Sequence, residues 1–257
     1  MLFIKDMTWS DVTVWQWQQI QQLNDKKNSI KEEDLIINTV AILINKTRSQ
    51  VLSLSERAIK KVIRDIEFLY LQEPKMRASD FIKVGKQKFK CDYDARFSEA
   101  GRYIEIKYFT PDFANNLHKI AASMVIPMKP SLFGWKEIEY DSTKHEEYAE
   151  TLLSAPFEIV FGSVIQKLNN IKNLDASFKG LFNSDQKKEE DDGRDVSNQF
   201  MKYFGWIYQA KLVADHEGIE LDKVYKMSTI SFLNDLSYLI SKGSYEAELR
   251  RKANGNR

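Results

Sequence analysis

Apolar residues recur at three- and four-residue spacing over the amino-terminal part of the chain, which predicts amphipathic helices. The first such stretch follows residues 8–11, and its apolar members are Val12, Trp15, Ile20 and Leu23. Residues 32–44 are dense in aliphatic side chains, so we expect a buried helix there. After a short polar break at residues 47–51, a third helix is predicted from residues 53–56, which resemble a capped start, to Pro74.

The period changes to two over residues 81–91, where apolar and polar side chains alternate on both sides of Gly85 and Lys86. This alternation is typical of a β-hairpin. Residues 103–108 alternate as well, but the residues before them favour a helix equally, and we predict helix from Ser98.

Helical spacing returns over residues 112–124, and Pro127 and Pro130 are expected to end that helix because proline cannot continue one. We predict an irregular stretch beyond them, as far as Tyr140. Helix is then expected to resume from Lys144.

Residues 181–195 include the run FNSDQKKEEDDGRD, which is polar, highly charged and contains a glycine. Such a composition is typical of a linker rather than of a packed element. We therefore predict a helical domain over residues 1–180 and a helical carboxy-terminal module over residues 196–257. The expected fold class is mainly α: a bundle-like amino-terminal part with a small β-hairpin near residues 81–91, and a second small helical module.

Charge and cysteine content narrow the functional classes. The 257-residue chain has 38 Lys and Arg against 37 Asp and Glu, so no long-range field draws the whole molecule to nucleic acid. Cys91 is the only cysteine, which excludes an intramolecular disulfide and a cysteine-built zinc site and is typical of an intracellular protein. The sequence shows neither a signal-peptide pattern nor a run of about 18 apolar residues, so we expect neither secretion nor a membrane span.

The residue types that carry catalysis do not form a recognisable set in this sequence. His118, His145 and His216 are far apart, and none has a helical partner four residues on that would complete a metal pair. The ten glycines form neither a Gly-x-Ser-x-Gly elbow nor a phosphate-binding loop. We therefore predict a protein that is not an enzyme, with no catalytic, metal-binding or cofactor-binding residues and no cofactor.

Tryptophans are the candidate contact residues. Trp15 and Trp17 lie two positions apart in the first predicted helix, so their side chains point about 200° apart and cannot both face one core. We predict that Trp15 packs inward and Trp17 is exposed, with the alternative that Trp17 covers the rim of the core. Because Trp is enriched in interface hot spots, Trp9, Trp17 and Trp206 are the expected protein-contact residues.

A small basic cluster near the carboxy terminus suggests a second functional class. Arg250, Arg251 and Lys252 are the candidate nucleic-acid contacts, so a nucleic-acid-associated adaptor is the alternative function. The neutral balance of the whole chain makes nucleic acid the less favoured partner. A divergent enzyme is a third class, which a cleft of converging titratable groups would support.

The order of these segments resembles assembly proteins of tailed bacteriophages. The amino-terminal part is similar to tail-assembly-chaperone-type proteins over residues 8–20, 51–54 and 66–69. A second set of segments resembles virion proteins of large phages that infect Bacteroidota, including the crAss-like group: residues 81–89, 101–105 and 126–127. The carboxy-terminal part is similar to the helical second module of such proteins over residues 204–208, 222–225 and 232–234.

This resemblance implies a protein of the head–tail or tail assembly pathway that acts by protein–protein contacts. It leaves two roles open, a transient chaperone for a tail component and a stable ring or cargo component of the particle. The implied partners are other virion or tail assembly proteins or a second copy of the chain, and the implied location is the host cytoplasm or the virion. The family has no catalytic residues to carry over.

Overall fold

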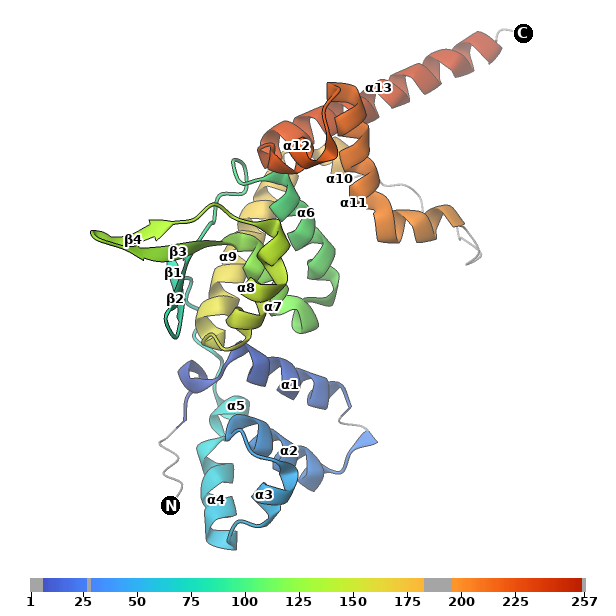
Figure 1. Ribbon diagram of the computed structural model, residues 1–257. Coiled ribbons are helices and arrows are strands. Elements are labelled where there is room, and N and C mark those ends of the chain that lie inside the picture. The colour runs from blue at the N-terminus through green and yellow to red at the C-terminus, as the bar shows by residue number, and fades with distance from the viewer. Residues whose placement is uncertain (1–6, 27–28, 183–195, 256–257) are drawn as a thin grey trace. The chain divides into compact units, whose positions relative to one another are not determined.

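The structure is a computed structural model that describes residues 7–26, 29–182 and 196–255 (Figure 1). The chain divides into two compact units, each made of two sequence segments. The first unit comprises Met1–Asp92 and Phe109–Gln166, and the second comprises Tyr93–Tyr108 and Lys167–Arg257. The predicted division at residues 181–195 differs from this one, and residues 183–195 lie outside the described part of the chain.

Five short helices and a 3-10 turn form the amino-terminal part of the first unit. Their bounds are Trp9–Asp11 for the 3-10 turn, then α1 Val14–Asp25, α2 Glu32–Leu43, α3 Arg48–Leu52, α4 Glu56–Asp65 and α5 Phe68–Leu71. The first two predicted helices are confirmed as α1 and α2. The third is divided into α4 and α5, and the predicted polar break is helix α3. The side chains of Thr47 and Gln50 cap each other's backbone there, which is enough to start a turn of helix.

Three further helices supply the main core of the first unit: α7 Phe113–Met124, α8 His145–Leu153 and the first half of α9 Phe157–Asp175. Apolar side chains on their facing sides are fully buried: Leu117, Ile120, Ala121, Leu152, Val160 and Val164. Their spacing of three and four residues is the helical period that predicted α7 and α8. Burial of this stripe is the main source of stability for the unit.

A four-stranded antiparallel sheet packs beside these helices, with strand order β1-β2-β3-β4 (Figure 1). The strands are β1 Phe81–Val84, β2 Gln87–Cys91, β3 Val125–Ser131 and β4 Gly134–Glu137. Strands β1 and β2 are the predicted hairpin, with Phe81 opposite Lys90 and Val84 opposite Gln87. The mainly helical class with a small hairpin is therefore confirmed.

The prediction of an irregular stretch after Pro127 is wrong, because β3 and β4 occupy it. The carbonyl of Pro127 accepts a hydrogen bond from the Ile138 amide (2.8 Å), so its nitrogen also points towards β4 and away from β2. Pro127 therefore stands opposite Phe89 without removing a hydrogen bond from the β2 ladder. A proline in this position ends the helix and still permits a strand.

An extended segment, residues 72–80, crosses α9 before the sheet begins. The Trp9 indole donates to the Gln72 carbonyl (2.8 Å), and the Lys75 amide donates to the Glu158 carboxylate (2.6 Å). Further along, the Ser79 amide donates to the Ser163 hydroxyl (3.1 Å). These contacts lie one to two helical turns apart on α9 and fix where β1 starts.

The second unit contains α6 Ala100–Phe109 up to Tyr108, the second half of α9, and the helices α10 Lys179–Phe182, α11 Val196–Glu217, α12 Leu221–Lys226 and α13 Thr229–Gly255. Two of its buried polar side chains form hydrogen bonds inside the unit. The Tyr103 hydroxyl donates to Asp175 (2.8 Å), and the buried Lys167 ammonium donates to the Asp94 carbonyl (2.6 Å). The helix predicted from Ser98 is confirmed as α6.

Gly162 gives a sharp test of the crossing on α9. A Cβ at this position would lie 2.6–2.8 Å from the backbone atoms of Arg77, which cannot rotate away as a side chain could. We expect Gly162→Ala to lower the free energy of unfolding by about 1–3 kcal/mol. Urea unfolding followed by tryptophan fluorescence measures this, because four of the five tryptophans belong to the first unit.

Gly243 in α13 provides the matched control, since an added Cβ there meets nothing within 4 Å. Gly243→Ala is expected to leave stability unchanged or to raise it by about 0.5–1 kcal/mol through helix propensity. Equal unfolding midpoints for the two variants would show that the close approach at Gly162 is not formed.

Candidate functional site

The sheet presents two chemically different faces. Side chains alternate along each strand, and the face towards the helices carries buried apolar residues such as Ile82 and Phe89. The opposite face, which we call the outer face, follows from the printed register. It carries Phe81, Lys83, Lys88, Lys90, Ile126, Met128, Trp135 and Glu137.

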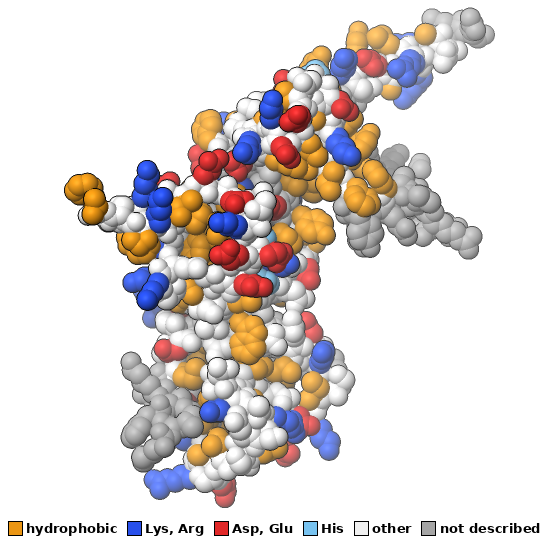
Figure 2. Space-filling view, in the orientation of Figure 1, with side chains coloured by type: hydrophobic (Ala, Val, Ile, Leu, Met, Phe, Trp, Pro, Cys, Tyr) orange, Lys and Arg blue, Asp and Glu red, His pale blue; other side chains and the backbone are white. Residues whose placement is uncertain are grey.

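Lysines are concentrated on the four strands and their turns. Residues 81–91 and 125–137 contain one acidic residue, Glu137, and six lysines, which are Lys83, Lys86, Lys88, Lys90, Lys129 and Lys136. The whole chain has a net charge of only +1, so this local excess is balanced elsewhere. We call residues 81–91 and 125–137 the lysine-rich sheet; its blue side chains lie beside β1 to β4 in Figure 2.

Like charges face each other at two places in this sheet. Lys83 stands directly opposite Lys88 between β1 and β2, and Lys129 stands opposite Lys136 between β3 and β4. Directly opposed like charges destabilise a strand pair. Glu137 offsets part of the charge through its ion pair with Lys90 (2.6 Å), which raises the pKa of that lysine. An anionic partner would relieve the remaining repulsion.

The turn between β3 and β4 carries two apolar side chains in full contact with solvent. Leu132 is 97% exposed and Phe133 is 100% exposed. Gly134 has a φ of +119°, a conformation that L side chains rarely adopt, and the Ser131 hydroxyl donates to its carbonyl (3.2 Å). Turns are usually polar, so two adjacent exposed apolar side chains at a projecting tip make this turn a candidate contact site (Figures 1 and 2).

Aromatic rings and lysine share the outer face. The Lys88 ammonium lies 3.9 Å from the centroid of the Phe81 ring and 5.7 Å from that of the Trp135 ring. Both distances are within cation–π range. The outer face therefore combines apolar area with positive charge in one continuous surface.

Sequence reasoning missed the most exposed residues of this surface. Leu132, Phe133 and Trp135 fell in the stretch that was predicted to be irregular. The one local signal was Gly134 itself, because a glycine between two short runs is typical of a hairpin turn. Pro127 and Pro130 argued against a strand at this place, so the turn was not predicted.

The predicted orientations of Trp15 and Trp17 are reversed in the structure. Trp17 stacks on Phe157 with ring centroids 4.7 Å apart, while Trp15 is 40% exposed. The cause is tertiary: the Val14 amide donates to the Ala155 carbonyl and the Phe157 amide donates to the Val12 carbonyl, which ties the start of α1 to the start of α9. Helical spacing alone does not say which side of α1 this contact uses.

The other two candidate tryptophans also have partners inside the protein. Trp9 packs edge-on against Phe68 with ring centroids 5.5 Å apart, and its indole N–H donates to the Gln72 carbonyl in the extended segment of residues 72–80. Trp206 packs edge-on against Tyr103 at 5.5 Å in the second unit. All three predicted contact tryptophans are half-buried, so exposure does not single them out as a free surface.

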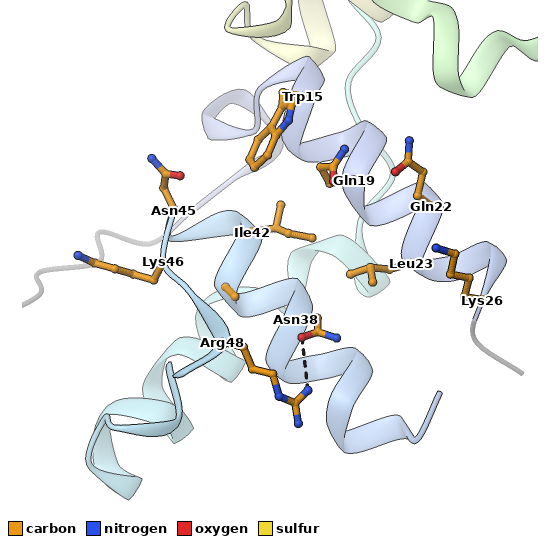
Figure 3. A pocket seen from close by; sticks show the side chains of 11 residues that line it. Trp15, Gln19, Gln22, Leu23, Lys26, Asn38, Ile42, Asn45, Lys46 and Arg48 are labelled. Carbon is orange, nitrogen blue, oxygen red and sulfur yellow. Dashed lines mark hydrogen bonds between the residues drawn. The ribbon is translucent and has the colours of Figure 1, made fainter. Parts of the chain in front are cut away.

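Trp15 instead lines a surface hollow of about 350 Å³ between α1 and α2 (Figure 3). Its other walls are mainly the side chains of Gln, Asn, Lys and Arg residues. Figure 3 shows the Arg48 guanidinium donating a hydrogen bond to the Asn38 side chain at the edge of the hollow. The hollow holds no pair of titratable groups poised for catalysis. It suits a weak contact with a polar surface.

Two glutamines of α1, Gln16 and Gln18, stabilise the fold rather than form a contact face. The Gln16 amide donates to the Leu43 carbonyl at the end of α2 (3.0 Å). The Gln18 amide donates to the Ala114 carbonyl at the start of α7 (2.8 Å). Both side chains are buried, so they connect α1 to the end of α2, where helix carbonyls lack intrahelical partners, and to the first turn of α7.

The candidate nucleic-acid contacts lie on the exposed last turns of α13. Arg250 pairs with Glu246 (3.9 Å), and Lys252 pairs with Glu248 (2.7 Å). Each pair is one helical turn apart, so the acidic side chains neutralise much of the local positive charge. This geometry weakens the electrostatic case for a nucleic-acid adaptor.

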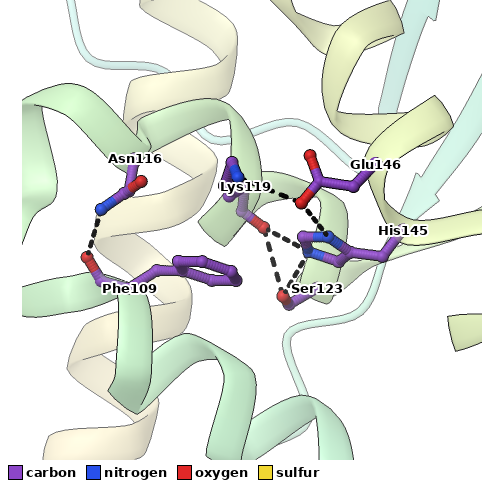
Figure 4. Close-up of polar contacts among 6 residues, drawn as sticks. All are labelled: Phe109, Asn116, Lys119, Ser123, His145 and Glu146. Carbon is purple, nitrogen blue, oxygen red and sulfur yellow. Dashed lines mark hydrogen bonds and ion pairs between the residues drawn. The ribbon is translucent and has the colours of Figure 1, made fainter. Parts of the chain in front are cut away.

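One cluster resembles a serine–histidine–acid arrangement at first sight (Figure 4). The Ser123 hydroxyl lies 3.0 Å from His145 Nε2, and Glu146 lies 4.0 Å from Nδ1 of the same ring. Nε2 is also 3.1 Å from the Lys119 carbonyl. A carbonyl oxygen can only accept, so a hydrogen bond at this contact requires the tautomer with the proton on Nε2, which has no lone pair there for a general base.

Burial also argues against a reactive serine at this point. Ser123 is 0% exposed, and its hydroxyl donates to the Lys119 carbonyl four residues earlier (3.1 Å). Phe109 stacks on the His145 ring at 5.5 Å and closes one side (Figure 4). No substrate can reach the oxygen in this arrangement. The cluster joins α7 to α8.

The described residues contain no group of three or more His, Cys, Asp and Glu side chains that could hold a metal ion. None of the helices in residues 7–26, 29–182 and 196–255 is long and apolar enough to cross a membrane. No protein-family model matches the chain, and comparisons with curated proteins and with solved structures find no match.

The reversed tryptophans can be tested by stability. We expect Trp17→Ala to lower the free energy of unfolding by about 2–4 kcal/mol, because it removes a ring packed on Phe157 and Phe161. Trp15→Ala is the matched control and is expected to cost less than about 1 kcal/mol, because the ring is half in solvent. Urea unfolding followed by circular dichroism measures both, and the opposite order would restore the sequence-based orientation.

His118 should make the first unit sensitive to mild acid. Burial, followed by the charge of Lys119, lowers the pKa of His118 to about 4, and its Nδ1 is buried without a hydrogen-bond partner. The folded pKa lies below the unfolded value of about 6.5, so unfolding binds a proton between these values. Stability is therefore expected to fall as the pH drops from about 6.5 to about 4.

The loss is expected to reach roughly 1–2 kcal/mol after allowance for partial solvent exposure of the ring. Thermal unfolding at closely spaced pH values measures it. His118→Gln removes the titrating group, so the slope in this pH window should flatten. An identical slope in the two proteins would assign the effect to other groups.

Proposed function

We propose that this chain is a non-enzymatic binding protein of an assembly pathway, and that the lysine-rich sheet is the surface by which it holds a partner protein. The observation that carries the proposal is the projecting turn, where Leu132 and Phe133 are almost completely exposed. Covering exposed apolar side chains with a partner lowers the free energy of the complex. An apolar tip next to strands that carry six lysines is suited to a partner with an apolar and acidic surface.

A protein partner fits this surface better than a small substrate. The hydroxyl of Ser123 and the imidazole of His145 are buried, and only the carboxylate of Glu146 beside them is exposed. The exposed groups of the sheet are lysines and aromatic or aliphatic side chains, which carry no nucleophile–base pair. Aromatic side chains are enriched in protein interfaces. The geometry thus supports binding rather than turnover.

The resemblance to tailed-phage assembly proteins gives this binding role its setting. Under the proposal, the partner is a virion or tail component in the host cytoplasm, and the chain acts as a tail assembly chaperone or as a ring or cargo component of the particle. A projecting hairpin serves either role. Release of the partner after assembly would distinguish the chaperone from the stable component.

The tip variant tests the proposal. Leu132→Ser combined with Phe133→Ser removes the exposed apolar area and should leave the fold intact, because neither side chain is buried. We expect the tagged variant, purified from cells that produce the virion, to retain at most about a tenth of the partner retained by the unaltered protein, as measured by native mass spectrometry.

A double substitution on α13 provides the control for nonspecific apolar adhesion. Tyr245 and Leu249 are also exposed apolar residues, at 62% and 47%. Tyr245→Ser combined with Leu249→Ser should leave partner recovery unchanged. Full recovery with the tip variant, or equal loss with both variants, would remove the lysine-rich sheet as the functional surface.

A further inference from the structure

The two edges of the sheet are not equivalent. At the β1 edge, the Ser79 hydroxyl accepts from the Phe81 amide (3.3 Å) and donates to the Phe81 carbonyl (2.9 Å). The amide of Cys91 donates to the carbonyl of Asp80, so the next residue, Phe81, directs its main chain away from β2. The hydroxyl of Ser79 therefore occupies the outward-directed main-chain groups of Phe81 at this edge.

The β4 edge has its main-chain groups directed into solvent. Because the Ile138 amide donates to Pro127 in β3, alternation turns the N–H and C=O groups of Glu137 and Trp135 to the other side. Strand β4 is last in the sheet order, and all four of its residues are exposed. Such an edge is a template for an added strand.

The side chains around this edge specify what such a strand would carry. Trp135 projects on the outer face and is 38% exposed, which favours an apolar side chain beside it. Lys136 projects on the opposite face and stands across from Lys129, which favours an acidic side chain there. Successive residues of the added strand would therefore alternate between apolar and acidic.

We infer that the β4 edge binds an extended segment of the partner protein as a fifth antiparallel or parallel strand, and that this segment alternates apolar and acidic residues. Main-chain hydrogen bonds to Trp135 and Glu137 hold it, and Lys129 and Lys136 select its acidic residues. This docking mode rests on the proposed function, since it names how the lysine-rich sheet holds its partner.

Two other occupants of the edge fit the geometry less well. A second copy pairing edge to edge would bring one Lys136 close to another, which repels the pair. A nucleic-acid strand follows one positively charged groove, whereas Lys88 and Lys136 lie on opposite faces of the sheet. The ring of Phe81 is also covered by the Lys88 ammonium, so a base would have to displace it before stacking.

The test uses the full chain and defined probes. The binding probe is a fluorescein-labelled octapeptide of alternating Val and Glu, measured by fluorescence polarisation at low and moderate salt. We expect saturable binding that weakens as salt rises, because the lysines are exposed and screened. We also expect slower amide hydrogen exchange at Trp135 and Glu137 when the peptide is bound.

Two substitutions at one position separate the main chain from the charge. Glu137→Pro removes an outward N–H at an edge where proline is tolerated, and it should weaken binding about tenfold or more. Glu137→Gln keeps that N–H and removes the negative charge, so binding should be unchanged or tighter. If Glu137→Pro disturbs the fold, N-methylation of alternate peptide amides makes the same test on the probe, and only one of the two alternating sets should abolish binding.

Three results would overturn the inference. The first is equal binding of an octapeptide of alternating Val and Lys, which would show nonspecific adhesion. The second is equal or tighter binding of an octathymidylate with no effect of Glu137→Pro, which would assign the surface to polyanions. The third is no binding of the acidic peptide. If partner recovery still depends on the Leu132 and Phe133 tip in that third case, the docking mode fails and the proposed function stands.

Discussion

The close approach of the chain to α9 at Gly162 is the constraint on which the first unit depends. Residues 72–80 cross the helix at Gly162, which has no side chain to obstruct the backbone. The side chains of Glu158 and Ser163 accept hydrogen bonds from the crossing backbone. The segment leads directly into β1, so its position on α9 decides where the sheet begins. The same helix receives the start of α1 through Val12 and Phe157. One helix thus places both the amino-terminal helices and the sheet.

The sheet contains like-charge pairs on both of its faces. Lys83 opposite Lys88 on the outer face and Lys129 opposite Lys136 on the other face are unfavourable pairs. Lysines on an edge strand also prevent uncontrolled pairing between copies, so part of this charge protects the protein from aggregation. In the proposed docking mode, the same lysines that repel a second copy select an acidic partner, because a lysine repels like charge and attracts the opposite charge.

The Ser123 and His145 cluster shows why residue types alone are a weak guide to chemistry. Ser123 lies 3.0 Å from Nε2 of His145, and Glu146 lies 4.0 Å from Nδ1 of the same ring, the order of contacts found in a hydrolase. The Lys119 carbonyl, however, can only accept a hydrogen bond, so its contact with Nε2 requires a proton on that nitrogen, which then cannot act as a base; the serine is also closed to solvent. Access and proton placement decide the role, and both are properties of the packed helices.

The sequence alone predicted the elements whose signal is local. Helical spacing of apolar residues gave α1, α2, α4, α7 and α8, and two-residue alternation gave the β1–β2 hairpin, because side-chain periodicity reports the backbone conformation directly. It missed α3, which depends on a single pair of capping side chains at Thr47 and Gln50. It also missed β3 and β4, because Pro127 reads as a stop until its partner strand is known.

The tertiary structure decided everything that depends on which surfaces meet. Trp17 rather than Trp15 faces the core because α9 lies on that side of α1, a fact that helical period cannot encode. The exposed tip at Leu132 and Phe133 became visible only when residues 125–137 paired as strands, and the open edge of β4 only when the strand order was known. The pattern along a chain fixes what each residue can do locally, whereas exposure and strand partners are set by contacts between residues far apart in sequence.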